Sequence, residues 1–149
     1  MRLRQGDRPE PAESKQAMQV ILHKTPLVPL AETPATFGLT LGDSVELQAD
    51  ASGAVTAVFW RKGRWSSLFG GRARQVPIGQ LVPEAADMIA PALRYGTDLR
   101  VRVVEICPAH LSAAGQDAVC LSVWGDRDRL VRAREREAAH ERAPDAAAG

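Results

Sequence analysis

The residues best suited to chemistry form one basic, aromatic segment, Phe59 to Arg74. From Ala51 to Pro83 the chain has no Asp or Glu but carries five basic residues, in a protein whose formal net charge is only +1. Guanidinium and ammonium groups bind phosphates and displace their counterions, and aromatic side chains between them can stack on unpaired bases. The predicted nucleic-acid-binding residues are Trp60, Arg61, Lys62, Arg64, Trp65, Arg72 and Arg74.

The same segment also fits two other roles. Alternation along a hairpin would place Phe59 in the core and Arg61 in water, while Trp65 and Phe69 could cover one end of a barrel. Arginine stems can lie over exposed apolar surface. An aromatic patch can also meet a protein partner. The sequence leaves these interpretations open beside nucleic-acid binding.

The cysteines and histidines are the candidate zinc ligands of the chain. Cys107, His110 and Cys120, with His23, offer suitable ligand types, but the paired spacings typical of structural zinc sites are absent. Two cysteines are too few for a disulfide framework, and a cytoplasmic setting disfavours a single bridge. We therefore expect neither a metal nor another cofactor.

No arrangement of residues predicts catalysis. The three histidines fall in a predicted strand, a loop and a tail, and Asp43 and Glu46 flank a turn. Gly70-Gly71 lacks the Gly-Lys-Ser/Thr end of a phosphate-binding P-loop. The sequence therefore predicts a protein that is not an enzyme.

The length of 149 residues suits one domain with tails. We expect a disordered tail over 1–16, a single β-rich domain over 17–125, and a charged helical or disordered tail over 126–149. Acids near Asp126 suit the first turn of a helix. With only Leu130 and Val131 as large apolar residues, that helix should be solvated and weakly packed.

Alternating apolar residues predict strands that would position the basic segment. A Pro-rich loop (Pro26, Pro29, Pro34) should follow the first strand. Turns are expected at Gly42-Asp43, Asp50–Gly53 and Lys62-Gly63. Pro77 makes its strand an edge candidate. The expected strands are Met18–His23, Ser44–Ala49, Ala54–Trp60, Val76–Val82, Leu99–Ile106 and Asp117–Trp124, the last two as an antiparallel hairpin.

One helix, over about 83–95, should pack on this sheet. Pro83 suits the first helical position, and Tyr95-Gly96 should end the helix. Pro91 should kink or split it. The residues expected to face the core are Ala85, Met88, Ile89, Ala92 and Leu93. The predicted class is mainly β: a small curled sheet or β-barrel of roughly five to seven strands with one core helix.

Three motifs occur in order along this body: Gly-Asp-x-Val-x-Leu (42–47), Ala-x-x-Ala-Val (54–58) and Ile-Gly-x-Leu-x-Pro (78–83), the last leading into a helix. On these motifs the chain from about Met18 to Trp124 resembles the HIRAN domain family. Members are small β-barrel domains, found alone in bacteria or attached to DNA-remodelling helicases. The resemblance implies a DNA-binding module, in some members with a pocket for a 3′ single-stranded end.

The chain departs from that family at two places. Residues 50–54 stand where the family has an Asn-Pro-x-Asp-x-Asn-Ala stretch, and the hairpin from Arg61 to Gln75 is longer than the family's turn. No pocket residue is therefore carried over. The basic segment is the part that differs most from the family.

The predicted function is a non-catalytic, nucleic-acid-binding accessory domain of a bacterium or phage, with single-stranded or end-containing DNA as its partner. The alternative is a protein-interaction or assembly module of a phage or mobile element, acting through exposed aromatics, the Pro-rich loop or the C-terminal helix. No secretory signal and no apolar stretch of the ~20 residues that a membrane helix needs is visible. A cytoplasmic protein without a membrane partner is expected.

Overall fold

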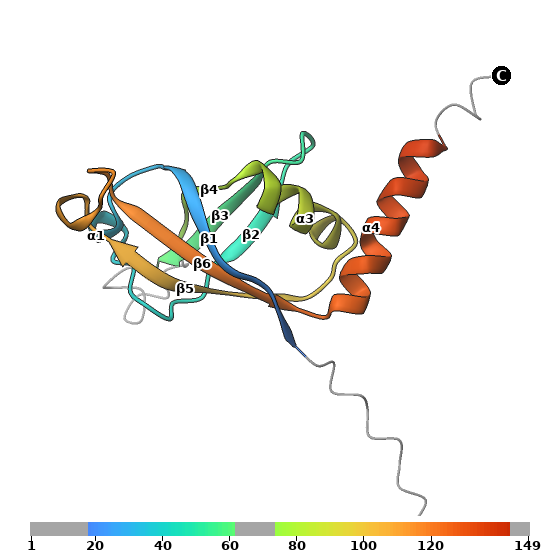
Figure 1. Ribbon diagram of the computed structural model, residues 1–149, viewed down its shortest axis with the longest axis horizontal. Coiled ribbons are helices and arrows are strands. Elements are labelled where there is room, and N and C mark those ends of the chain that lie inside the picture. Colours follow the sequence, from blue (N-terminus) through green and yellow to red (C-terminus); the bar gives the residue numbers. More distant parts are fainter. Residues whose placement is uncertain (1–17, 62–73, 144–149) are drawn as a thin grey trace, which may run out of the picture.

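Antiparallel strands dominate the computed structural model, which describes residues 18–61 and 74–143 (Figure 1). The predicted mainly β class is confirmed, with a curled sheet, a core helix and a C-terminal helix. The predicted tail over 1–16 lies outside the described residues. In chain order the elements are β1 (Gln19–Leu30), α1 (Pro34–Phe37), β2 (Glu46–Ala49), β3 (Val55–Arg61), β4 (Arg74–Leu81), α3 (Pro83–Arg94), β5 (Leu99–Cys107), the 3₁₀ turn η1 (Ala109–Leu111), β6 (Ala118–Gly125) and α4 (Arg127–Arg142).

The six described strands form one sheet in the order β2-β3-β4-β1-β6-β5, with every neighbouring pair antiparallel. The sheet curls until its two edges meet. The Gly42 amide donates to the Val103 carbonyl at 2.8 Å, and the Val45 amide donates to the Val101 carbonyl at 3.2 Å. The segment that leads into β2 is therefore fixed against β5.

β1 extends further than predicted, and the Pro-rich loop expected after His23 is wrong for most of its length. The strand continues to Leu30 and includes Pro26 and Pro29. Proline has no amide hydrogen to donate, and both prolines occupy positions where this matters little. Pro26 is the last residue paired with β6, and Pro29 falls in the register shift between Leu27 and Leu30.

β4 is an interior strand, between β3 and β1, so the edge position predicted from Pro77 is wrong. The pairing of β4 with β1 spans Gly79 to Leu81, while its pairing with β3 continues to Arg74. Pro77 therefore lies beyond the β1 contact, next to the register shift at Ala57/Val58 of β3. A missing amide hydrogen is tolerated at such an irregularity.

The core lies inside the curl and under α3. Its most buried large side chains include Val55, Ile78, Ile89 and Leu121, all with 0% exposure. The predicted alternation holds in the segment around β2, where Val45 and Leu47 are buried while the flanking polar residues face water. At Gly79 the backbone of β1 passes so close that a Cβ would lie 2.7 Å from the Pro29 carbonyl oxygen. Glycine is the residue that permits this approach.

α3 begins at Pro83 and ends at Arg94, followed by Tyr95 and by Gly96 at φ +67°, as predicted. Pro91 does not split it, contrary to one of the two expected outcomes. Pro91 removes the hydrogen bond to the carbonyl of residue 87, and this carbonyl belongs to an exposed residue that water can reach. After Pro91 the helix continues for only about one more turn, to Arg94.

α4 begins as predicted, because the Asp126 carboxylate accepts the amides of Asp128 and Arg129 at 2.9 and 3.3 Å. Most of the helix is exposed, as expected. It nevertheless packs on α3, because Leu130 and Ala133 are buried. An ion pair between Glu137 of α4 and Arg94 of α3 adds to this contact. The helix extends away from the sheet on the α3 side of the molecule (Figure 1).

Candidate functional site

The structure describes only the two ends of the predicted nucleic-acid-binding segment. Trp60 and Arg61 end β3, and Arg74 begins β4. The other predicted site residues, Lys62, Arg64, Trp65 and Arg72, lie outside the described residues, as do the turn expected at Lys62-Gly63 and the returning half of the hairpin. The antiparallel pairing of β3 with β4 brings the three described residues to one end of the sheet.

Arg61 and Arg74 are direct cross-strand partners, and both are exposed. Side chains directly opposite each other share one face of an antiparallel pair and lie within interaction range. Like charges in this arrangement repel and destabilise the pair. Neither arginine has a salt bridge or side-chain hydrogen bond within the described part of the chain. The arrangement therefore concentrates positive charge that an anion would neutralise.

Trp60 has a different environment. Because it is adjacent to Arg61 in a strand, its side chain lies on the opposite face. Trp60 is 46% exposed, and its indole Nε1–H donates to Oε2 of Glu46 on β2 at 2.9 Å. The other oxygen of that carboxylate accepts from Gln48 at 3.4 Å. The structure thus divides the described part of the predicted site into an arginine pair and a tryptophan held beside an acid.

Phe59 contributes to the core, which is one of the roles that the sequence left open for this segment. It is half-buried and packs against the core, directly opposite Val76 of β4. Its ring thus anchors the end of β3 to the core. Phe59 and Arg61 are two residues apart, so they share one face of β3. Alternation therefore does not separate them as expected; this face passes from the core at Phe59 to solvent at Arg61.

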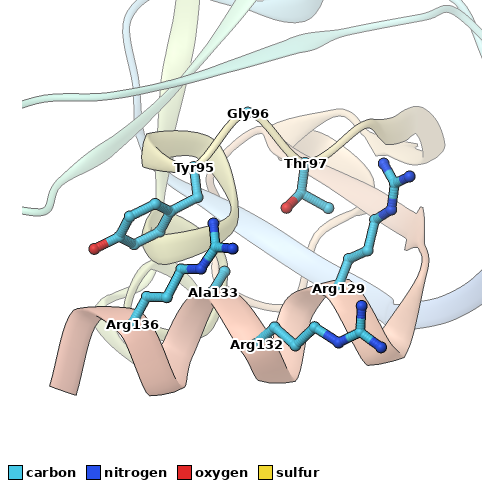
Figure 2. A pocket seen from close by; sticks show the side chains of 7 residues that line it. All are labelled: Tyr95, Gly96, Thr97, Arg129, Arg132, Ala133 and Arg136. Atoms are coloured by element: carbon cyan, nitrogen blue, oxygen red, sulfur yellow. The ribbon is translucent and has the colours of Figure 1, made fainter. Parts of the chain in front are cut away.

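A second basic region, absent from the predicted site, lies at the other end of the molecule. Arg129, Arg132 and Arg136 of α4 line a pocket of about 220 Å³ together with Tyr95, Gly96, Thr97 and Ala133. Figure 2 shows the arginine side chains extending from α4 beside the turn that links α3 to β5. The Arg136 guanidinium carbon lies 5.9 Å from the centroid of the Tyr95 ring, within the range of a cation–π contact.

An apolar pocket of about 290 Å³ lies between α1 and the start of the loop after β5. Its one acidic residue, Asp117, already accepts the Ala109 amide at 2.8 Å and so holds that loop in place. Its remaining lining residues are Thr33, Pro34, Ala35, Leu39, Ile106 and Pro108. This lining offers a shape for an apolar group and contains no basic side chain.

The cysteines are both free thiols. Cys120 is buried in β6, and burial raises the pKa of its thiol, which disfavours the reactive thiolate. The described residues contain no group of three or more His, Cys, Asp or Glu side chains that could hold a metal ion. His23 and His110 are exposed.

No protein-family model, no curated protein and no solved structure matches the chain. Within the described residues, none of the helices is both long and apolar enough to cross a membrane.

Proposed function

We propose that this domain is a non-catalytic DNA-binding accessory module that contacts phosphates with the basic end of the β3–β4 pair. The observation that carries the proposal is the cross-strand pair of Arg61 and Arg74, exposed and without a described counter-charge. A phosphodiester between the two guanidinium groups would relieve their repulsion and accept charge-assisted hydrogen bonds from both. The like-charge pair thus costs stability in the unbound domain and favours the bound state.

Trp60 adds a second type of contact on the other face of β3. Its exposed indole offers a surface for stacking on an unpaired base, which is worth roughly 1–3 kcal/mol per base. Single-stranded or end-containing DNA exposes such bases, and it can bend around the end of a strand pair to reach both faces. The resemblance to HIRAN domains supports the same class of ligand.

Fluorescence anisotropy with labelled single-stranded, duplex and tailed DNA, across a range of salt concentrations, tests this proposal. Affinity should fall steeply as salt rises, because phosphate contacts release counterions. Arg61→Ala and Arg74→Ala should each weaken binding and reduce the salt slope by about one. The control is Arg100→Ala, which removes the same charge from an exposed position on β5.

Two outcomes would contradict the proposal. One is the absence of binding to any of the three DNAs at low salt. The other is an equal loss of affinity in the Arg61, Arg74 and Arg100 variants, which would leave only a general effect of net charge. Either result would favour the alternative of a protein-interaction module, for which the exposed Trp60 and the largely exposed α4 supply surface.

A further inference from the structure

The pocket between α4 and the α3–β5 turn has the composition of an oxyanion site. Arg129, Arg132 and Arg136 are spaced by three and four residues, so they lie on one face of α4. Burial of Leu130 and Ala133 against α3 fixes how this helix lies against the turn. None of the residues that line the pocket is acidic. Three guanidinium groups thus gather at one pocket of about 220 Å³.

Two acids, the cap residue Asp126 and Glu137 of α4, have contacts of their own. Oδ1 of Asp126 caps the helix, and its Oδ2 lies 3.9 Å from Nε of Arg129, at the outer limit of an ion pair. Glu137 pairs with Arg94. Arg132 makes no salt bridge or side-chain hydrogen bond with any residue that the structure describes. The lining itself thus carries three arginines and no acid, and arginines at these spacings repel one another.

The α3–β5 turn can contact a ligand only through its side chains, because its backbone amides are already hydrogen-bonded to α3. The amides of Tyr95, Gly96 and Thr97 donate to carbonyls of α3 at 3.1, 3.3 and 2.8 Å. Thr97 lies across the pocket from α4, where its hydroxyl could donate to a ligand oxygen (Figure 2). Tyr95 is 39% exposed, and its ring lies at the Arg136 end, where it could contact a sugar or base.

We propose that this pocket binds a phosphate group, held by the guanidinium groups of Arg129, Arg132 and Arg136 and by the Thr97 hydroxyl. Arginine is suited to this ligand because its planar fork of N–H donors matches the geometry of phosphate oxygens. The phosphate can belong to a DNA strand or to a small phosphate ester such as a nucleotide. The site does not depend on the proposed function, since it shares no residue with the Arg61–Arg74 pair and is built from other elements, α4 and the α3–β5 turn.

Titration of the full, ¹⁵N-labelled chain with sodium phosphate tests the proposal, with sodium chloride at matched ionic strength as the reference. Saturable NMR shifts are expected at the Gly96 and Thr97 amides and at the three arginine Nε–H groups, with phosphate only. Arg132→Ala should weaken the apparent affinity at least about tenfold. The control is Arg134→Ala, which removes an exposed arginine from α4 that does not line the pocket.

The opposing explanation is that the arginines only complement the negative C-terminal end of α3. In that case Arg132→Ala would lower the melting temperature and leave the phosphate titration unchanged. That result would overturn the proposal, and so would shifts that are equal in phosphate and chloride.

DNA anisotropy and a titration with adenosine 5′-monophosphate identify the source of the phosphate. If Arg132→Ala weakens DNA binding and reduces its salt slope by about one, the pocket takes a strand phosphate. If DNA binding is unchanged while phosphate and nucleotide binding are lost, the ligand is a small phosphate ester. Failure of Arg61→Ala to affect DNA binding would count against the proposed function alone, because the phosphate titration measures a different pocket.

Discussion

At one end of β4, Arg61 and Arg74 face solvent as a cross-strand pair, placed there by the backbone register of two strands. On α4, Arg129, Arg132 and Arg136 line a pocket that exists only because α4 packs on α3. The first group needs no tertiary contact beyond the sheet. The second depends on a helix held by a few buried side chains. The two basic regions can therefore be removed independently of each other.

The two regions also differ in how their charge is balanced. β3 and β4 carry no acid, yet the sheet brings Glu46 of β2 to the indole of Trp60 at 2.9 Å. α4 contains the acids Asp128, Glu135, Glu137 and Glu141, yet Arg129, Arg132 and Arg136 line the pocket while Glu137 pairs with Arg94. Counting charges along the sequence therefore misses the acid that lies near the β3–β4 arginine pair. It also misses the cluster of arginines at the α4 pocket.

The largest effect should come from undocking α4. Leu130→Ala removes one of the two side chains of α4 that are buried among the described residues, and it should lower the free energy of unfolding by about 2–3 kcal/mol. Phosphate-induced shifts at Thr97 should weaken together with stability, while DNA binding through Arg61 and Arg74 persists. Urea unfolding followed by circular dichroism, together with the NMR titration, measures both effects.

Val131→Ala is the matched control, because Val131 is adjacent and 52% exposed. It should change stability by less than about 0.5 kcal/mol. An equal loss in the two variants would mean that α4 is not held by Leu130.

Charge reversal at β3 should have the next largest effect. Arg61→Glu replaces a repulsive cross-strand pair by an attractive one, so stability should rise by up to about 1 kcal/mol. DNA affinity at low salt should nevertheless fall at least about tenfold, and the salt slope by about two, because two phosphate contacts are lost. Opposite changes in stability and affinity are the signature of this variant.

Arg100→Glu on β5 imposes the same change of net charge without a facing arginine, since its cross-strand partner is Trp124. It should weaken DNA binding less than Arg61→Glu and should not stabilise the protein. Equal affinities of the two variants would show that the arginine pair has no special role.

A smaller effect is expected from the acid beside Trp60. Glu46→Gln removes a negative charge next to the basic end and keeps an oxygen that can accept the indole N–H. DNA affinity should rise by roughly two- to threefold at low salt, and this gain should vanish as salt screens the charge. Glu84→Gln, on an exposed residue of α3, is the control and should have no such effect.

The smallest effect concerns the β2–β3 turn, which lies on the α4 side. The Asp50 carboxylate accepts the amides of Ser52 and Ala54 and the Ser52 hydroxyl. These bonds, above all the one from Ser52, hold the pKa of Asp50 below its ordinary value of 3.8. A depressed pKa in the folded state means that the stabilisation is complete above pH 3.8 and is lost as the pH falls through the lower, folded value.

Asp50→Ala should therefore be less stable than the wild type at neutral pH, and the difference should shrink in acid below pH 3.8. Thermal melts at several pH values measure it. A difference that is constant across this range would mean that the charge of Asp50 is irrelevant. Gly53 of this turn lies close to Arg94, which pairs with Glu137 of α4. The Asp50→Ala variant should therefore show small NMR shifts near α4 and none at Arg74.

Most elements could be predicted because their signals are local. Alternation predicted β3, β5 and β6, and the Asp50–Gly53 turn forms where its residue types indicate. The extent of β1 could not be predicted, because Pro26 and Pro29 signal a loop unless the partner strands are known. The edge position predicted from Pro77 is wrong for the same reason. The register shift that accommodates this proline is a property of the β3–β4 pair.

The candidate site was predictable only in part. The acid-free segment identified Arg61 and Arg74, because their charge is concentrated locally. The contact of Trp60 with Glu46 comes from sheet pairing between residues separated in sequence. The α4 pocket has a periodic signal, arginines on one helical face, but Tyr95 and Thr97 complete it only after the fold brings them there. From the sequence alone, the charge of this helix indicates only a solvated surface.

The meeting of the two sheet edges has a consequence for self-association. An exposed edge strand is a row of unpaired backbone groups on which another chain can add a strand, which is a common route to aggregation. Along β5, Val101 and Val103 already share hydrogen bonds with the segment from Gly42 to Val45. A second copy or an extended peptide would have to displace these bonds first. The curl of the sheet thus protects β5 from intermolecular strand addition along this stretch.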